Sequence, residues 1–226
     1  MVIKSEAMDD PVIKRVLVWS GWLRISHASV GLAVLLLLFT GWLIAESPSL
    51  AESALDLHYL ASSFLIFGLV VRIVLMFAGM EHERLPGLFP ASSELYAMAK
   101  TFLFYISLGK SPMPGWYAQN PLWKPAYLVI YLALIVLVIT GAAMPDVSLM
   151  LGFYLPSVHT FWAQLLFWFT VLHIGSVVMH DYRNKTTDIS AMVNGYRLFL
   201  IDSNRAASVA ENMVQRISID SLKKNK

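Results

Sequence analysis

The chain contains no cysteine, and charged residues make up only 14% of its 226 residues, against about 25% in soluble domains. Without cysteine there can be no disulfide, iron–sulfur cluster, thiolate zinc site or covalently attached c-type haem. Hydrophobic residues make up 57% of the chain, and its mean hydropathy is +0.61. This composition excludes a disordered chain, an ordinary soluble enzyme and a nucleic-acid-binding protein.

Four apolar stretches are long enough to cross a hydrocarbon core about 30 Å thick, which takes about 20 helical residues. They cover residues 25–45, 57–79, 123–144 and 158–180. A shorter apolar run at residues 101–108 cannot cross, and we expect it to lie at the membrane surface. The sequence therefore predicts an all-α integral membrane protein. Its four-helix bundle domain occupies residues 1–200, and residues 201–226 form a polar cytoplasmic tail.

Basic residues are absent from two of the loops. The loops at residues 46–56 and 145–157 contain no Lys or Arg, whereas the chain after residue 182 is rich in both. Because Lys and Arg concentrate on the cytoplasmic side, we expect both termini in the cytoplasm and no nucleic-acid role for the basic tail. Residues 1–10 are acidic and the first apolar run lacks a small-residue cleavage site, so we expect no cleaved signal.

Four of the six histidines lie inside the predicted spans, where ionisable groups are costly and usually functional. His159 and His173 share one face of the fourth span, about 21 Å apart along its axis. The direction of each span gives the depth of its histidines. His27 and His173 are expected toward the cytoplasm. His58 and His159 are expected toward the outside.

Two facing imidazoles at equal depth can hold one haem iron from both sides, so the depths predict two haem sites across the membrane. A single intramembrane histidine is as easily explained as a packing residue or part of a proton path. Four histidines that pair by depth are harder to explain in this way. Zinc would need three or four ligands close together, whereas these histidines form two distant layers.

Three further residues are candidates near the inner layer. His180 follows His173 by about 10 Å along the helix and could replace it as a ligand. We prefer His173, which leaves His180 as a quinone or proton site, or as an interface residue without a role. Arg24 and Arg72 could bind haem propionates, although Arg24 could equally reach lipid headgroups. No catalytic residue is expected, because haem carries the redox chemistry. His82 is expected to be a solvated loop residue.

The chain also contains a weak internal repeat. The Thr–Gly pair at residues 40–41, in the first span, matches the pair at residues 140–141 in the third. His58 and His159 follow these pairs at nearly equal intervals. The two outer histidines therefore occupy equivalent places in two helical hairpins. Gly31, one turn after His27, is one of several small residues that leave space between helices.

These motifs resemble the bacterial four-helix dihaem cytochrome b family, which includes the b-type subunits of Ni/Fe-hydrogenases and formate dehydrogenases. The resemblance covers residues 15–199 and rests on several short segments. They are RISH at 24–27 followed by TG at 40–41, His58, NPL at 120–122, the paired histidines of the fourth span, HDYRN at 180–184 and ISAMVNGYR at 189–197. The NPL and GYR elements are most similar to the hydrogenase branch. The chain departs from that branch at Gln119, where a histidine is usual.

The resemblance implies two haem b groups, an inner one held by His27 and His173 and an outer one held by His58 and His159. It also implies the membrane subunit of a complex in the lipid of the bacterial inner membrane. An outer-side redox subunit such as a Ni/Fe-hydrogenase would exchange electrons with the outer haem. Menaquinone or ubiquinone would react near the inner haem. Electrons moving inward would then contribute to the membrane potential, at about 2.3 kcal/mol per charge per 100 mV.

Two other functions remain open from the sequence. The first is a stand-alone membrane quinone oxidoreductase that acts on a small outer-side acceptor or donor. The short outer loops leave little protein for a substrate pocket, but they leave the outer haem accessible. The second is a proton channel or transporter with a histidine relay. However, no span has an acidic residue near its middle, and there is no pair of Pro-broken helices of the kind that transporters use.

Overall fold

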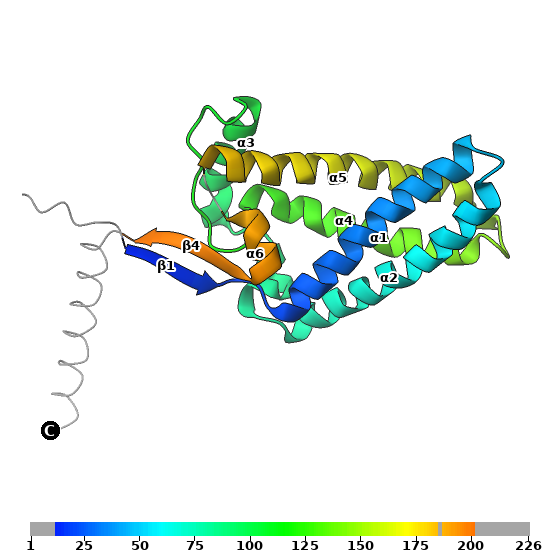
Figure 1. The fold of residues 1–226 in the computed structure, drawn as a ribbon, viewed down its shortest axis with the longest axis horizontal. Coiled ribbons are helices and arrows are strands. Elements are labelled where there is room, and N and C mark those ends of the chain that lie inside the picture. Colours follow the sequence, from blue (N-terminus) through cyan, green and yellow to red (C-terminus); the bar gives the residue numbers. More distant parts are fainter. Residues whose placement is uncertain (1–11, 185–186, 202–226) are drawn as a thin grey trace, which may run out of the picture.

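The computed structural model describes residues 12–184 and 187–201, so the acidic start and all but residue 201 of the tail lie outside the described residues. Four long helices run lengthwise through one bundle (Figure 1). They are α1 (Gly21–Glu46), α2 (Ala51–Ala78), α4 (Lys124–Ala143) and α5 (Leu155–Asn184). Each is long and apolar enough to cross a membrane, which confirms the predicted all-α bundle of four spans.

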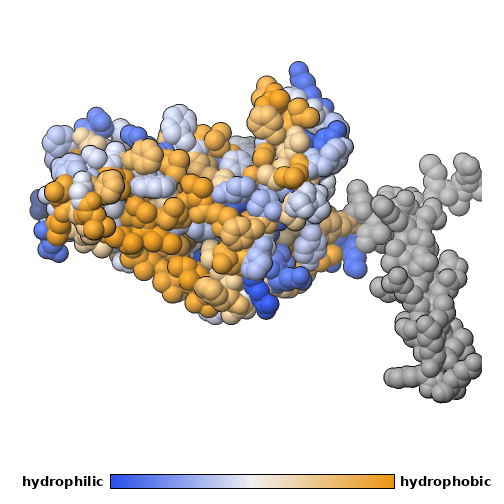
Figure 2. Space-filling model, turned by 180° about the vertical axis from the view of Figure 1, so that it is seen from behind, coloured by the Kyte–Doolittle hydropathy of each residue, from blue (hydrophilic) through white to orange (hydrophobic). Residues whose placement is uncertain are grey.

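The helix ends follow local chemistry. Ser20 caps α1 by accepting a hydrogen bond from the Leu23 N–H. α4 begins with proline in its first turn, where the missing N–H has no helical partner to lose. Figure 2 shows hydrophobic side chains over the middle of the bundle, with strongly hydrophilic ones toward the ends. Helices that are apolar on all sides suit a lipid environment.

Close packing joins α1 to α2 through small residues. A Cβ atom at Gly68 would lie 2.8 Å from Cγ2 of Val30 and 3.0 Å from the Ser26 carbonyl oxygen. The Ser26 hydroxyl donates to the Gly68 carbonyl at 2.7 Å. α4 also packs along α5, and α2 contacts α4. The buried core draws on all four helices: Ala33, Val34, Leu65, Leu69, Ile130, Leu134, Leu137 and Leu166.

One end of the bundle carries α3 (Leu95–Ile106), α6 (Asp188–Asn194) and a two-stranded sheet (Figure 1). In this sheet β1 (Val12–Leu17) pairs antiparallel with β4 (Tyr196–Ile201). Neither strand was expected from the sequence. The twelve residues of α3 are too few to cross a membrane. Phe104 of α3 is buried while Phe102 and Ile106 are exposed, the pattern of a helix that lies on a membrane surface.

Four 3₁₀ turns complete this end: η1 (Glu81–Glu83), η2 (Leu85–Leu88), η3 (Ser92–Glu94) and η4 (Pro121–Trp123). The Glu83 carboxylate is fully buried and accepts from the N–H of Ser20 at 2.9 Å and of Met80 at 3.0 Å. The loop after α2 is thereby tied to the start of α1.

His82 is consequently not solvated, and that expectation was wrong. Its ring lies between Trp19 and Tyr117, with centroids 5.6 and 5.5 Å away, and Nε2 is hydrogen-bonded to the Val18 carbonyl. The folded loop, rather than the composition around the histidine, decides its environment.

The connections between helices are short at the opposite end of the bundle. It holds the α1–α2 turn and a small hairpin of β2 (Leu149–Met150) and β3 (Phe153–Tyr154). Leu151 and Gly152 make the hairpin turn with φ of 53° and 81°, and the Leu151 side chain is exposed. Little protein therefore covers this end in the described part of the chain.

Candidate functional site

The four intramembrane histidines meet in two pairs. His27 on α1 faces His173 on α5, with ring centroids 6.2 Å apart and ring planes tilted by 56°. His58 on α2 faces His159 on α5, at 6.4 Å and 54°. The structure thus brings together the residues that the depth argument pairs. Because α5 supplies one histidine to each pair, the two sites lie along a single helix.

The spacing of each pair fits one metal ion between the rings. With metal–nitrogen bonds of about 2 Å and about 1.2 Å from ring nitrogen to ring centre, two axial imidazoles have centroids about 6.4 Å apart. The observed separations of 6.2 and 6.4 Å match this value. Over residues 12–184 and 187–201, no group of three or more His, Cys, Asp or Glu side chains is placed to hold a metal. Axial histidine pairs completed by a macrocycle fit the geometry better than zinc sites.

A threonine orients each histidine of the His58–His159 pair. The Thr40 hydroxyl donates to the Leu36 carbonyl at 2.8 Å and lies 2.8 Å from Nδ1 of His58. A hydroxyl has one hydrogen, so Thr40 must accept the second bond from Nδ1–H. This hydrogen bond fixes the tautomer and leaves the lone pair of Nε2 free to bind a metal.

The second hairpin repeats the arrangement. The Thr140 hydroxyl donates to the Val136 carbonyl at 2.8 Å and accepts from Nδ1 of His159 at 2.8 Å. A Cβ atom on Gly141 would lie only 3.3 Å from Cε1 of His159. Threonine therefore holds the ring, and the glycine after it makes room for it. The Thr–Gly repeat was visible in the sequence, but the hydrogen bond from each histidine to its threonine was not predicted from it.

Aromatic rings hold the inner pair. Phe169 stacks on His173, with centroids 5.6 Å apart and planes within 9°. Trp123 and Tyr127 meet the same ring edge-on at 6.3 and 6.4 Å. These contacts restrict the rotation of the His173 ring and surround it with apolar surface, which lowers the local dielectric.

A cavity of about 560 Å³ lies beside the inner pair, within the range of ligand sites in proteins. His27, Arg72, His173 and His180 are among its lining residues. Gly31 also lines it, and a Cβ atom there would have no neighbour within 4 Å. Space for a flat ring is thus present one helical turn from His27.

Arg72 brings an uncompensated charge to this cavity. Its side chain is only 5% exposed; Nε donates to the Tyr131 hydroxyl and Nη1 to the Glu83 carbonyl, both at 2.8 Å. No carboxylate of the described residues forms an ion pair with it. Burial of an unpaired charge is costly, so a carboxylate of a bound ligand would be stabilised here.

Arg24 is directed elsewhere. Its Nη1 donates to the Val193 carbonyl at the end of α6. Its Nε is buried and has no hydrogen-bond partner in the described part of the chain. Arg24 therefore ties α1 to α6 and keeps one donor available.

His180 is buried at the α6 end of the same cavity. Its Nε2 lies 2.8 Å from the Tyr105 hydroxyl, and its Nδ1 lies 3.4 Å from Oδ2 of Asp188. Burial raises the pKa of Tyr105 despite hydrogen bonds from Trp123 and Asn120. Tyr105 and Asp188 were missed from the sequence, because they come from α3 and α6 and no spacing motif connects them to His180.

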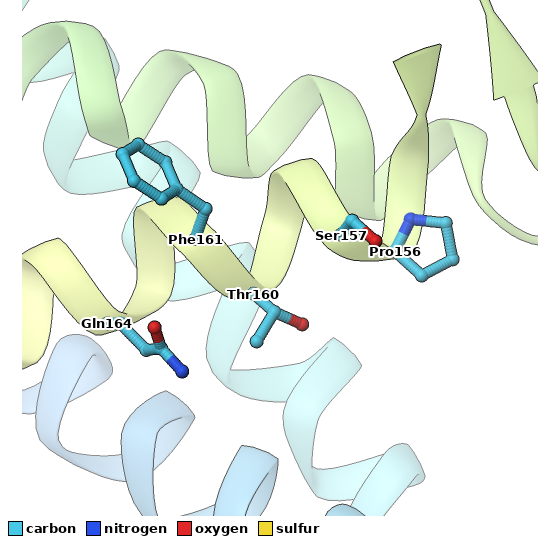
Figure 3. A pocket seen from close by; sticks show the side chains of 5 residues that line it. All are labelled: Pro156, Ser157, Thr160, Phe161 and Gln164. Carbon is cyan, nitrogen blue, oxygen red and sulfur yellow. The ribbon is translucent and has the colours of Figure 1, made fainter.

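A second hollow, of about 350 Å³, follows the N-terminal part of α5 (Figure 3). Thr160 and Gln164 extend from one side of the helix and Phe161 from the other. The remaining lining residues are Pro156 and Ser157. None of the candidate ligands lines this hollow, so it is separate from the histidine pairs.

The comparison with known proteins agrees with this geometry. The family model described as prokaryotic cytochrome b561 matches residues 18–195, which include all four paired histidines. A probable Ni/Fe-hydrogenase B-type cytochrome subunit of Cupriavidus necator is 26% identical over 218 residues, covering 83% of this chain and 88% of that protein. The protein of the same name from Azotobacter vinelandii is 27% identical over 221 residues, covering 83% and 90%. No solved structure matches the chain.

Proposed function

Because the chain belongs to the prokaryotic cytochrome b561 family, we propose that it carries electrons between an outer-side hydrogenase and the quinone pool through two haem b groups. At the coarser level, it is a multi-pass membrane b-type cytochrome for electron transfer, with haem b as its cofactor. The proposal rests on one observation: two facing histidine pairs, each with one histidine on α5.

His58 and His159 would hold the outer haem, and His27 and His173 the inner one. Bound haem supplies one-electron chemistry at its iron. Thr40 accepts the Nδ1 hydrogen of its histidine, which makes Nε2 a more basic ligand. Apolar helices around each pair exclude water and keep the site at low dielectric.

Arg72 is the stronger candidate for a propionate of the inner haem, because it lines the cavity and lacks a counter-ion among the described residues. Arg24 is the weaker candidate, because it does not line the cavity and only its Nε lacks a partner among the described residues. Arg72 would orient the ring and offset the propionate charge.

Menaquinone or ubiquinone would enter the inner cavity, which extends past His173 toward His180 and Asp188. Both nitrogens of His180 already face protein partners, so we assign it to proton exchange rather than to direct hydrogen bonding with quinone. This end would lie in the cytoplasm, with residues 1–200 in the membrane domain and the tail inside, which the distribution of Lys and Arg supports.

A hydrogenase partner is supported by the relatives, which are named as hydrogenase B-type cytochrome subunits. The short α1–α2 turn and the β2–β3 hairpin leave room for a redox subunit next to the outer pair. The membrane would then be the inner membrane of a bacterium.

The test is purification of the tagged chain from native membranes in a mild detergent. Hydrogenase subunits should co-purify, and hydrogen gas should reduce the haem of the complex. In the His58→Ala variant hydrogen should no longer reduce the inner haem, because the outer haem is missing. Haem without a large outer partner would favour the stand-alone oxidoreductase. A colourless protein that moves protons would favour the histidine channel.

A further inference from the structure

Three side chains from three elements meet at the cytoplasmic end of the inner cavity. His180 on α5 has the Tyr105 hydroxyl of α3 at 2.8 Å from Nε2 and the Asp188 carboxylate of α6 at 3.4 Å from Nδ1. His180 is 3% exposed, whereas the Asp188 side chain is 17% exposed. The chain of groups therefore runs from the surface toward the cavity.

Neighbouring groups restrict the hydrogen positions in this chain of groups. The Trp123 indole N–H can only donate, and it does so to the Tyr105 oxygen at 2.7 Å. Asn120 accepts from the Leu122 N–H through Oδ1, so its amide nitrogen faces Tyr105, at 3.1 Å. Both lone pairs of the tyrosine oxygen are thus in use. Its own hydrogen goes either to Nε2 of His180, at 2.8 Å, or to the Ser176 hydroxyl, which is also hydrogen-bonded to Tyr105.

When Tyr105 donates to Nε2, neutral His180 carries its hydrogen on Nδ1, facing Asp188. Oδ1 of Asp188 is paired with Nη2 of Arg197 on β4 at 2.9 Å. The same guanidinium donates to the carbonyls of Trp116 and Tyr117 at 3.0 and 2.9 Å, which fixes it in place. Near His180, the charged and titratable groups are therefore Asp188 and Arg197, Tyr105, and on α5 itself His173 and Asp181. The Asp181 carboxylate accepts from backbone N–H groups of α6.

We propose that His180 is a proton-loading site, which takes a proton from the cytoplasm when the inner haem takes an electron and makes it available to the ligand in the cavity. The inference rests on the proposed function. Tyr105 first turns its hydrogen from Nε2 toward Ser176, whose own hydrogen goes to the His173 carbonyl. The proton then enters the cavity beside Asp188, which also lines it, and binds the freed Nε2, while Nδ1 keeps its hydrogen facing the Asp188 carboxylate. One electron and one proton are added together, so the local charge does not change. Tyr105 and Asp188 are positioning residues in this scheme.

The test uses the purified full chain, freed of quinone, in a redox titration followed by visible spectra at several pH values. If one proton accompanies one electron, each tenfold change in proton concentration shifts the inner midpoint potential by about 59 mV. The potential of the inner haem should fall as the pH rises, and that of the outer haem should not. In His180→Gln, this dependence should be lost.

Two controls keep the test decisive. His82→Gln removes another histidine of the same end, which is hydrogen-bonded to Val18 and does not line the cavity, and it should keep the pH dependence. If the His180→Gln protein lacks the inner haem and cannot be titrated, Asp188→Asn provides the test instead. This variant retains His180, and the pH dependence of its inner potential should be smaller than in the unaltered chain. A pH-independent inner potential in the unaltered chain, or an unchanged dependence in both His180→Gln and Asp188→Asn, would overturn the inference without affecting the haem assignment. Absence of haem from the unaltered chain would overturn the proposed function itself.

Discussion

Nδ1 of His159 lies 2.8 Å from the Thr140 hydroxyl, and the same distance separates Nδ1 of His58 from Thr40. In both cases the threonine is on the helix that precedes the histidine in its hairpin. The outer layer is therefore built twice from the same parts. The inner layer is not repeated, because its histidines come from α1 and α5 and it contains the buried Arg72 instead.

The first prediction concerns Thr140, which accepts a hydrogen bond from Nδ1 of His159. Thr140→Val removes the acceptor from Nδ1 of His159 while keeping the side-chain volume. The ligand becomes less basic, so the ferric state is less stabilised and the midpoint potential of the outer haem should rise. Haem affinity at that site should fall by about tenfold or more. A redox titration and a haem-retention assay measure both effects. Thr101→Val, on α3 and bonded only within its own helix, is the control. Equal potentials in both variants would show that Thr140 has no such role.

The glycines that follow the threonines should differ in tolerance. A Cβ atom at residue 141 would press on Cε1 of His159 at 3.3 Å, whereas one at Gly41 would lie at an ordinary 3.8 Å from His58. Gly141→Ala should therefore displace its histidine and reduce outer haem occupancy. Gly41→Ala should leave it nearly intact. Visible spectra of the two purified variants give the comparison, and a larger loss in Gly41→Ala would contradict it.

A third prediction tests the packing of α1 on α2. Gly68→Ala would place a methyl group 2.8 Å from Val30 and 3.0 Å from a backbone oxygen of α1 that cannot move alone. Overpacking of this kind costs about 1–3 kcal/mol, so the melting temperature in detergent should fall. Because the contact is next to His27, inner haem should be lost before outer haem. Gly115→Ala, which meets no atom within 4 Å, should melt like the unaltered chain. Equal melting temperatures for both variants would argue against tight contact between the helices.

The fourth prediction is a pH dependence at the start of α4. Both oxygens of Glu94 lie 2.8 Å from Nζ of the buried Lys124. Burial raises the pKa of Glu94, but hydrogen bonds from Lys124 and the Ala91 N–H outweigh it, so the pKa lies below its ordinary value. Because the pKa of Glu94 is lower in the folded than in the unfolded chain, the charged carboxylate stabilises the fold at pH values above its unfolded pKa. This stabilisation is lost as the pH falls through the folded pKa.

Glu94→Gln should accordingly lower the melting temperature at about pH 7, where the carboxylate is charged. The difference from the unaltered chain should shrink as the pH falls through the lowered pKa of Glu94, because the protonated carboxyl group is then neutral like the glutamine amide. Glu81→Gln, at an exposed residue of the same end, should show no such trend. A constant difference at all pH values would mean that the charge of Glu94 is not the cause.

Much of the fold follows from the sequence because the bilayer imposes it. Apolar runs of about 20 residues leave few alternatives to spanning helices, so the four spans are confirmed. Their ends are extended in the structure, as α2 begins at Ala51 rather than at residue 57. Polar residues that continue a helix into the headgroup region contribute nothing to an apolar run. Depth along straight helices also sufficed to pair His58 with His159.

The remainder depends on contacts between distant segments. β1 and β4 are about 180 residues apart along the chain, and each forms because the other is present. Tyr105, Asp188 and Arg197 reach His180 only after three separate elements fold onto the end of the bundle. His82 changed from solvated to packed for the same reason. Local sequence patterns do not indicate such contacts between distant segments.

The central claim is that the two histidine pairs hold two haems. The most direct measurement is a haem count by pyridine haemochrome on the purified chain and on its four histidine-to-alanine variants. The account predicts two haem b per chain, and one in each variant. His58→Ala and His159→Ala should lose the same spectral component, and His27→Ala and His173→Ala should lose the other. A single haem in the unaltered chain, or loss of one component by His58→Ala and of the other by His159→Ala, would contradict it.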